Sequence, residues 1–184
     1  MSTKSKLTVN VGAVAYIAVV AAMYVAATFS IAFMSFGPIQ FRVSEVLNLL
    51  AFFNPIFAPA VLLGVFIANI FSPYGLVDII FGTGASAIAL ALILITRKLL
   101  GGGAVSLFVA ALWPVVINAL VIPLVFMLYA GDGVTLAAFL PFAGSIAFGQ
   151  FVVVVMFGYT LCRVLMAKNP RFIDIITNLN RTHI

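Results

Sequence analysis

Long apolar runs alternate with short polar breaks along the whole chain, and the breaks set the limits of the predicted helices. The apolar runs cover residues 9–32, 43–53, 56–71, 76–99, 104–129 and 136–166. Proline, glycine and asparagine lie between them, and these residues end helices and form turns. A short amphipathic helix is predicted at 172–179. The pattern therefore predicts six membrane-crossing helices and a polar tail.

The composition agrees with this pattern. The chain has 184 residues, of which 65% are hydrophobic and only 7% are charged, whereas soluble domains are about 45–50% apolar and about 25% charged. About 20 apolar residues cross a bilayer as a helix, and runs without strict alternation disfavour a transmembrane barrel. We predict an all-α integral membrane protein, a six-transmembrane-helix bundle over 1–168 with a cytoplasmic tail at 169–184.

Basic residues predict the orientation of this bundle. Six crossings put both termini on one side of the membrane, together with eight of the nine basic residues, and Arg42 alone lies on the other. The cytoplasmic side of a membrane carries the excess of Lys and Arg, so both termini are expected in the cytoplasm. The bundle itself is expected in a prokaryotic cell membrane. The positive charge then faces anionic lipid rather than nucleic acid. The eight residues are Lys4, Lys6, Arg97, Lys98, Arg163, Lys168, Arg171 and Arg181.

Polar residues gather at the outer ends of the predicted helices. One stretch of six residues contains Gln40, Arg42, Ser44 and Glu45, and it joins the first two helices. The next outer turn brings Asn69, Tyr74 and Asp78. A charge within the hydrocarbon costs roughly 2.5–3.5 kcal/mol, so buried acids at these positions indicate a function. The pattern favours a pocket whose carboxylates accept hydrogen bonds from a ligand.

Two simpler explanations compete with a pocket. Arg42 and Glu45, three residues apart, could neutralise each other on one helix, although this leaves Asn69 and Asp78 unexplained. The aromatic residues nearby could form an interfacial belt, whereas as a group beside polar side chains they suit a flat ligand held by stacking. These aromatic residues are Phe29, Phe36, Phe41, Phe71, Tyr74 and Phe81.

The inventory of reactive residues argues against an enzyme. His183 is the sole histidine and lies in the tail, and Cys162 is the sole cysteine, so neither a Ser–His dyad nor a multi-cysteine metal site is expected. The chain has no P-loop sequence for ATP. We expect no catalytic residue, no metal and no cofactor. For the mid-span amides Asn118 and Gln150, hydrogen bonding between helices is favoured over ligand contact.

The first apolar run carries small residues at intervals of four. Ala18, Ala22 and Ala26 fall on one helix face. Such a face permits close packing against a neighbouring helix. The neighbour could be a partner protein or another helix of the same chain, and the sequence leaves both possibilities open.

Two motifs together resemble a known family. The run Gly37-Pro38-Ile39-Gln40-Phe41-Arg42-Val43-Ser44-Glu45, and Asn69 followed by Ser72-Pro73-Tyr74-Gly75-Leu76-Val77-Asp78 and Phe81-Gly82, are similar to those of the QueT family. Members of this family are substrate-binding S components of energy-coupling factor (ECF) transporters. The resemblance covers nearly the whole chain in length and number of spans, and the Gln-Phe-Arg-x-Ser-Glu run is its most specific part.

The resemblance implies a function and its partners. It implies capture of a queuosine precursor, a 7-deazaguanine such as preQ1, preQ0 or queuine, from outside the cell. A transmembrane coupling subunit, docked on Ala18, Ala22 and Ala26, and two cytosolic ATPases would drive uptake. Another flat vitamin or base, a stand-alone secondary transporter and a membrane scaffold remain as alternatives. The substrate-binding residues would be Gln40, Phe41, Arg42, Glu45, Asn69, Tyr74 and Asp78.

Overall fold

The computed structural model describes residues 11–36, 40–130 and 133–179, and the regular structure within these ranges is helical. Three helical segments depart from α geometry: η1 is a 3₁₀-helix, and η2 and η3 are π-helices. The elements are α1 (Val11–Ser30), α2 (Ala32–Ser35), η1 (Val43–Leu49), α3 (Leu50–Phe53), α4 (Phe57–Ile70), η2 (Asp78–Gly82), α5 (Thr83–Leu100), α6 (Ala104–Ala130), α7 (Leu136–Gln150), η3 (Phe151–Tyr159), α8 (Thr160–Lys168) and α9 (Pro170–Asn178).

The predicted apolar runs correspond to α1, η1–α3, α4, η2–α5, α6 and α7–η3–α8. Each segment begins and ends within two residues of its predicted limits. Four helical stretches in the described chain are long and apolar enough to cross a membrane: Gly12–Ser30, Asp78–Leu100, Ala104–Ala130 and Leu136–Lys168. Val43–Phe53 and Phe57–Ile70 are apolar but shorter. The protein is therefore an all-helical membrane protein, and its full number of crossings stays a prediction.

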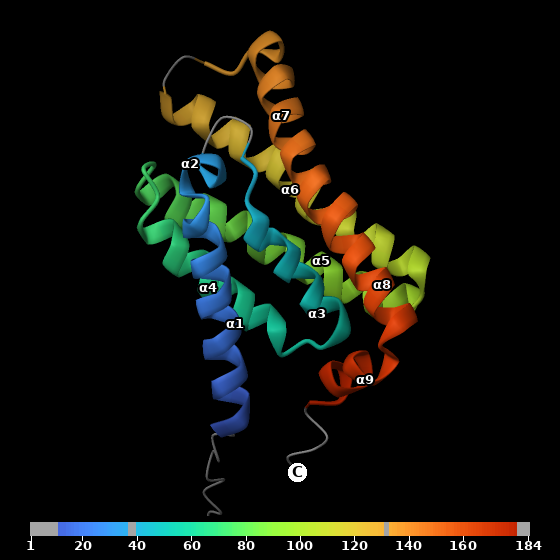
Figure 1. Cartoon of the computed structure of the whole chain (residues 1–184). Helices are drawn as coiled ribbons and strands as arrows, with labels where there is room; N and C mark the ends of the chain where they lie inside the picture. Colours follow the sequence, from blue (N-terminus) through green and yellow to red (C-terminus); the bar gives the residue numbers. More distant parts are fainter. Residues whose placement is uncertain (1–10, 37–39, 131–132, 180–184) are drawn as a thin grey trace, which may run out of the picture.

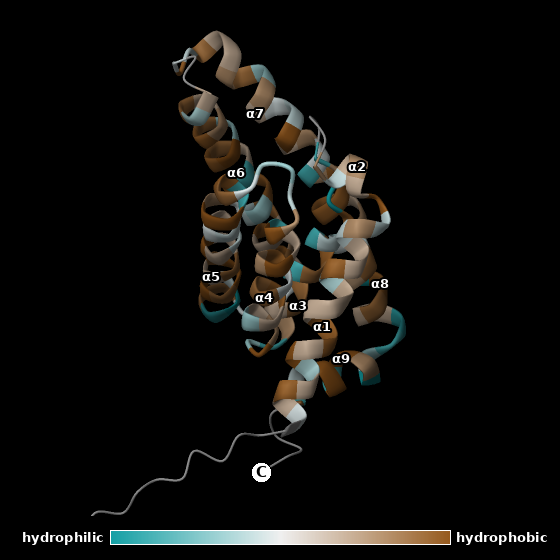
Figure 2. Ribbon diagram, turned by 90° about the vertical axis from the view of Figure 1, so that its left-hand side faces the viewer, coloured by the Kyte–Doolittle hydropathy of each residue, from teal (hydrophilic) through white to brown (hydrophobic). Residues whose placement is uncertain are grey.

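The successive segments run in alternating directions through one bundle (Figure 1). The start of α1 and the short helix α9 lie at the lower end of that view, while α2 and the start of α7 lie at the upper end. Most of the helical surface is hydrophobic, and hydrophilic residues gather toward the helix ends and connections (Figure 2). This distribution suits a bundle whose flanks face lipid and whose two ends face water.

The closest helix packing joins α1 to α4. Gly64 of α4 lies against Tyr24 of α1, and a Cβ built on Gly64 would be 2.6 Å from the Cβ of Tyr24. Only glycine therefore permits this approach. Both Tyr24 and the neighbouring core residues Val61 and Val65 are fully buried, so α4 holds one face of α1 firmly in the bundle.

The opposite face of α1 carries the three alanines. Ala18, Ala22 and Ala26 are all exposed, and the large apolar side chains of Val19 and Met23 beside them are also more than half exposed. The described helices of this chain therefore do not cover the alanine face. The described helices thus do not supply the neighbour within the chain that the sequence allowed, and docking of a partner protein on this face stays a prediction.

The end of the chain returns to the bundle. Asn54, just after α3, donates from Nδ2 to the carbonyl oxygens of Ile176 and Thr177 in α9, at 3.0 and 3.3 Å. Ile176 is buried against the core. The helix predicted at 172–179 is thus present as α9. Some residues that the sequence-based predictions used lie outside the described residues: Lys4, Lys6, Gly37, Pro38, Ile39, Arg181 and His183.

Candidate functional site

Arg42 lies at the centre of the buried polar residues. It precedes η1 and is only 7% exposed. Its Nη1 donates to Oδ1 of Asn69 at 3.5 Å, and its guanidinium carbon lies 5.2 Å from the centre of the Phe36 ring. The buried Nε has no hydrogen-bond partner among the residues that the structure describes. Arg42 interacts electrostatically with Tyr24, Glu45 and Asp78, so both acids of the site lie within range of its charge.

Glu45 is held by α1 and by its own helix. Tyr24 donates from its hydroxyl to Oε1 at 2.7 Å, and Asn48 donates from Nδ2 to Oε2. One helical turn beyond Tyr24, the hydroxyls of Thr28 and Ser44 are 2.7 Å apart. All five residues are buried. Because charged partners strengthen hydrogen bonds, these contacts fix η1 against α1.

Asp78 begins the π-helix η2 in the second half of the site. Its Oδ2 accepts a hydrogen bond from Ser72 at 2.5 Å. Its backbone carbonyl accepts one from Nδ2 of Asn69 at 3.0 Å, and the same amide donates to Thr83 Oγ1 at 3.2 Å. A Cβ on Gly82 would be 3.0 Å from that Nδ2, so the glycine leaves room for the Asn69 amide.

The remaining predicted site residues are Gln40, Phe41 and Tyr74. Gln40 is buried and has a φ of 50°, a left-handed conformation that is uncommon outside glycine and often marks functional sites. Phe41 packs edge-on against Phe148, with ring centres 6.1 Å apart. Tyr74 is 38% exposed, donates from its hydroxyl to the Phe36 carbonyl at 3.1 Å, and packs on Phe126.

The structure thus brings Arg42, Glu45, Asn69 and Asp78 together from three separate segments. The simple pair that the sequence allowed, Arg42 with Glu45, is not what holds the carboxylate, because its described hydrogen bonds come from Tyr24 and Asn48. We call the assembled residues the polar cluster: Tyr24, Thr28, Arg42, Ser44, Glu45, Asn48, Asn69, Ser72, Asp78 and Thr83.

Several members of the polar cluster were absent from the predicted site. Tyr24 and Thr28 lie four residues apart on an otherwise apolar helix, so a shared polar face was visible in the sequence. Asn48 follows Glu45 by three residues, which also places it on a common face. Thr83 is different, because its role depends on how Asn69 of α4 meets η2 in space, and no local spacing indicates it.

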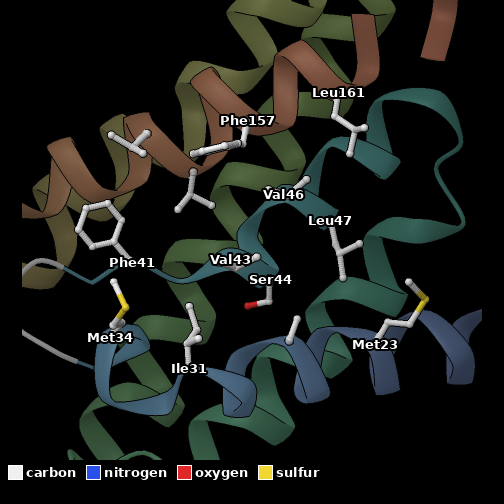
Figure 3. Close-up of a pocket in the computed structure, with 13 residues that line it drawn as sticks. Met23, Ile31, Met34, Phe41, Val43, Ser44, Val46, Leu47, Phe157 and Leu161 are labelled. Carbon is white, nitrogen blue, oxygen red and sulfur yellow. The ribbon is translucent and has the colours of Figure 1, made fainter. Parts of the chain in front are cut away.

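A large apolar cavity adjoins the polar cluster without belonging to it. It has a volume of about 720 Å³ and lies between α1, the η1 segment and η3. Figure 3 shows Met23 of α1 and Ile31, just before α2, facing Val46 and Leu47 of η1, with Phe157 on the far wall. Ser44 is its one polar side chain. This lining offers a polar ligand too few hydrogen bonds, so the candidate site is the polar cluster.

Comparison with known proteins places this geometry in a family. A family model described as QueT transporter matches residues 14–167, a range that contains the whole polar cluster. The chain belongs to the QueT transporter family. The queuosine precursor transporter QueT of Lactococcus lactis subsp. cremoris (strain MG1363) is 46% identical to it over 78 residues, and the match spans 41% of this chain and 46% of that protein. No solved structure gives a significant match.

Proposed function

We propose that this QueT family member is the substrate-binding S component of an ECF importer and captures a queuosine precursor. Family membership supports transport, and the similar protein from Lactococcus lactis is named for that substrate class. The observation that carries the proposal is the buried Arg42, which interacts with two acids and an amide and whose Nε has no hydrogen-bond partner in the described chain. A buried donor without a partner is costly, and a ligand acceptor would satisfy it.

The chemistry of a 7-deazaguanine suits this set of groups. Its ring presents N1–H and an exocyclic amine side by side, next to a carbonyl oxygen. A carboxylate accepts both N–H groups at once. The Arg42 Nε would donate to the carbonyl oxygen. An analogue lacking these groups leaves buried polar atoms unpaired and is rejected strongly.

The hydrogen bonds of Glu45 and Asp78 suggest a different role for each acid. Both oxygens of Glu45 already accept bonds from Tyr24 and Asn48. Asp78 accepts from Ser72 through Oδ2, and its Oδ1 has no hydrogen bond to another residue in the described part of the chain. We therefore assign the ring edge to Asp78. Glu45 would balance a cationic group such as the aminomethyl group of preQ1.

The other predicted residues would support this arrangement. Asn69 already uses its oxygen on Arg42 and its nitrogen on Asp78 and Thr83, so it positions those residues. Phe41 and Tyr74 would stack on the flat ring, and Gln40 would contact a ring edge. The S component would dock on a transmembrane coupling subunit through Ala18, Ala22 and Ala26, with two cytosolic ATPases supplying energy in the cell membrane.

Calorimetric titration of preQ1 into the purified full chain in lipid nanodiscs tests the proposal. We expect the wild-type protein to bind, and Asp78→Asn to lower the affinity at least about tenfold, which corresponds to about 1.4 kcal/mol. Asp174→Asn, on the exposed face of α9, serves as the matched control and should bind normally. The proposal is contradicted if the wild type does not bind, or if Asp78→Asn and Glu45→Gln both bind as the wild type does.

A further inference from the structure

Two buried amides outside the polar cluster make no hydrogen bond to another described residue. Asn118 of α6 is 5% exposed and Gln150 of α7 is 2% exposed. Neither side chain hydrogen-bonds to another residue in the described chain, and the fully buried Oε1 of Gln150 is without a partner there. The interhelical hydrogen bond favoured from the sequence is therefore not made. An unpaired buried amide destabilises a protein, and a ligand that supplied the missing hydrogen bond would remove this cost.

The packing of α6 against α7 and η3 puts the two amides at the same level. These helices are antiparallel because a short connection joins α6 to α7. The rings of Phe126 and Phe142 are 6.2 Å apart, and those of Phe108 and Tyr159 are 5.5 Å apart. Asn118 comes eight residues before Phe126, and Gln150 comes eight residues after Phe142. The two amides thus lie at the same level of the bundle, between two aromatic contacts.

This level is also the level of Arg42. Phe148 packs on Phe41 with ring centres 6.1 Å apart. Gln150 follows Phe148 by two residues, a rise of about 3 Å along a helix, and Arg42 directly follows Phe41. Further along, a Cβ on Gly158 would lie 3.2 Å from Leu49 Cδ1. The η1 segment therefore runs beside α7 and η3, with Arg42 and Gln150 at matching depth.

The local backbone around both amides is also irregular. The π-helix η3 begins directly after Gln150, just as the π-helix η2 begins at Asp78. Single π-turns inside α-helices are frequent at functional sites. Pro114 and Pro123 flank Asn118 within α6, and each removes one backbone hydrogen bond of that helix. Each buried amide therefore lies beside a backbone irregularity.

We propose that Asn118 and Gln150 form a second, uncharged wall of the ligand site and hydrogen-bond the flat base opposite the Arg42–Asp78 wall. This assignment rests on the proposed function. An amide both donates and accepts, so the pair can satisfy a mixed donor and acceptor edge without adding charge. The unpaired Oε1 of Gln150 accepts a ring N–H. Each residue then determines specificity as well as affinity, because a mismatched edge leaves a buried amide unpaired.

The test compares Asn118→Leu and Gln150→Leu with the wild type in two assays on the full chain in nanodiscs. Titration with preQ1 measures affinity, and thermal unfolding without ligand measures stability. We expect each variant to lose at least about tenfold in affinity. Unfolding temperatures without ligand should stay the same or rise, because an unpaired buried amide has been replaced by an apolar side chain.

Asn54→Leu is the matched control, since Asn54 is an equally buried amide that bonds to α9 at the other end of the bundle. It should unfold at a lower temperature and bind preQ1 normally. Wild-type-like affinity in both leucine variants overturns this assignment while the proposed function stands. A loss of unfolding temperature like that of Asn54→Leu overturns it too. Failure of the wild type to bind preQ1 overturns the proposed function and this assignment together.

Discussion

The hydroxyl of Tyr24 donates to Oε1 of Glu45 at 2.7 Å, and both side chains are buried. This bond ties the middle of α1 to the charged segment that precedes α3. The same helix exposes Ala18, Ala22 and Ala26 on its other side. The helix α1 therefore supports the candidate site through Tyr24 and also carries the proposed docking face. A shift of α1 on docking would thus move a residue that holds Glu45.

Tyr24→Phe removes this bond and keeps the ring. We expect the free energy of unfolding to fall by about 1–3 kcal/mol, because the Glu45 carboxylate loses a buried donor. Affinity for preQ1 should fall as well, since Glu45 is then less firmly placed. Tyr16→Phe, also on α1 but outside the polar cluster, is the control for thermal unfolding and titration. Equal effects of the two substitutions would show that the bond has no special role.

Gly64→Ala tests the contact between α1 and α4. The added Cβ would meet the Cβ of Tyr24 at 2.6 Å and the carbonyl oxygen of Ala21 at 3.0 Å. We expect the helices to separate and stability to fall by about 1–3 kcal/mol. Gly84→Ala meets nothing within 4 Å, and alanine there should raise stability slightly, by about 0.5–1 kcal/mol. Thermal unfolding of both variants measures these changes in stability. An unfolding temperature of Gly64→Ala equal to that of the wild type would contradict the close packing of α1 on α4.

Ala22→Leu and Ala26→Leu test the docking face. A larger side chain on this face should block close helix approach, so uptake by cells expressing the complete transporter should be lost while purified protein still binds preQ1. Ala91→Leu, equally exposed but on α5, provides the comparison and should leave uptake intact. Normal uptake with leucine at position 22 or 26 would refute docking through this face.

Helix limits were predictable because proline and glycine act locally. Asn54-Pro55 and Ser72-Pro73 end their helices where expected, since proline restricts its own backbone and that of the preceding residue. The same helix-ending residues predicted that Arg42, Glu45 and Asp78 lie near helix ends. Glu45 and Asp78 could be identified as candidate site residues because charged residues are rare in this apolar chain.

The partners within the site were harder to predict, because they come from segments far apart in sequence. Asn69 meets Arg42 and Asp78 only when α4 packs beside η1 and η2. The 3₁₀ geometry of η1 and the π geometries of η2 and η3 were not indicated by the residue pattern. Whether Gln150 is hydrogen-bonded likewise depends on how the helices pack. The sequence favoured a hydrogen bond between helices, whereas Oε1 of Gln150 has no partner in the described chain.

The small molecule that co-purifies with the full chain tests the central claim most directly. Protein purified from cells supplied with queuosine precursors, extracted and measured by mass spectrometry, should release a 7-deazaguanine, and Asp78→Asn protein should release much less. A different vitamin in the wild-type extract would contradict the account. So would wild-type protein that releases no 7-deazaguanine and retains none after incubation with preQ1.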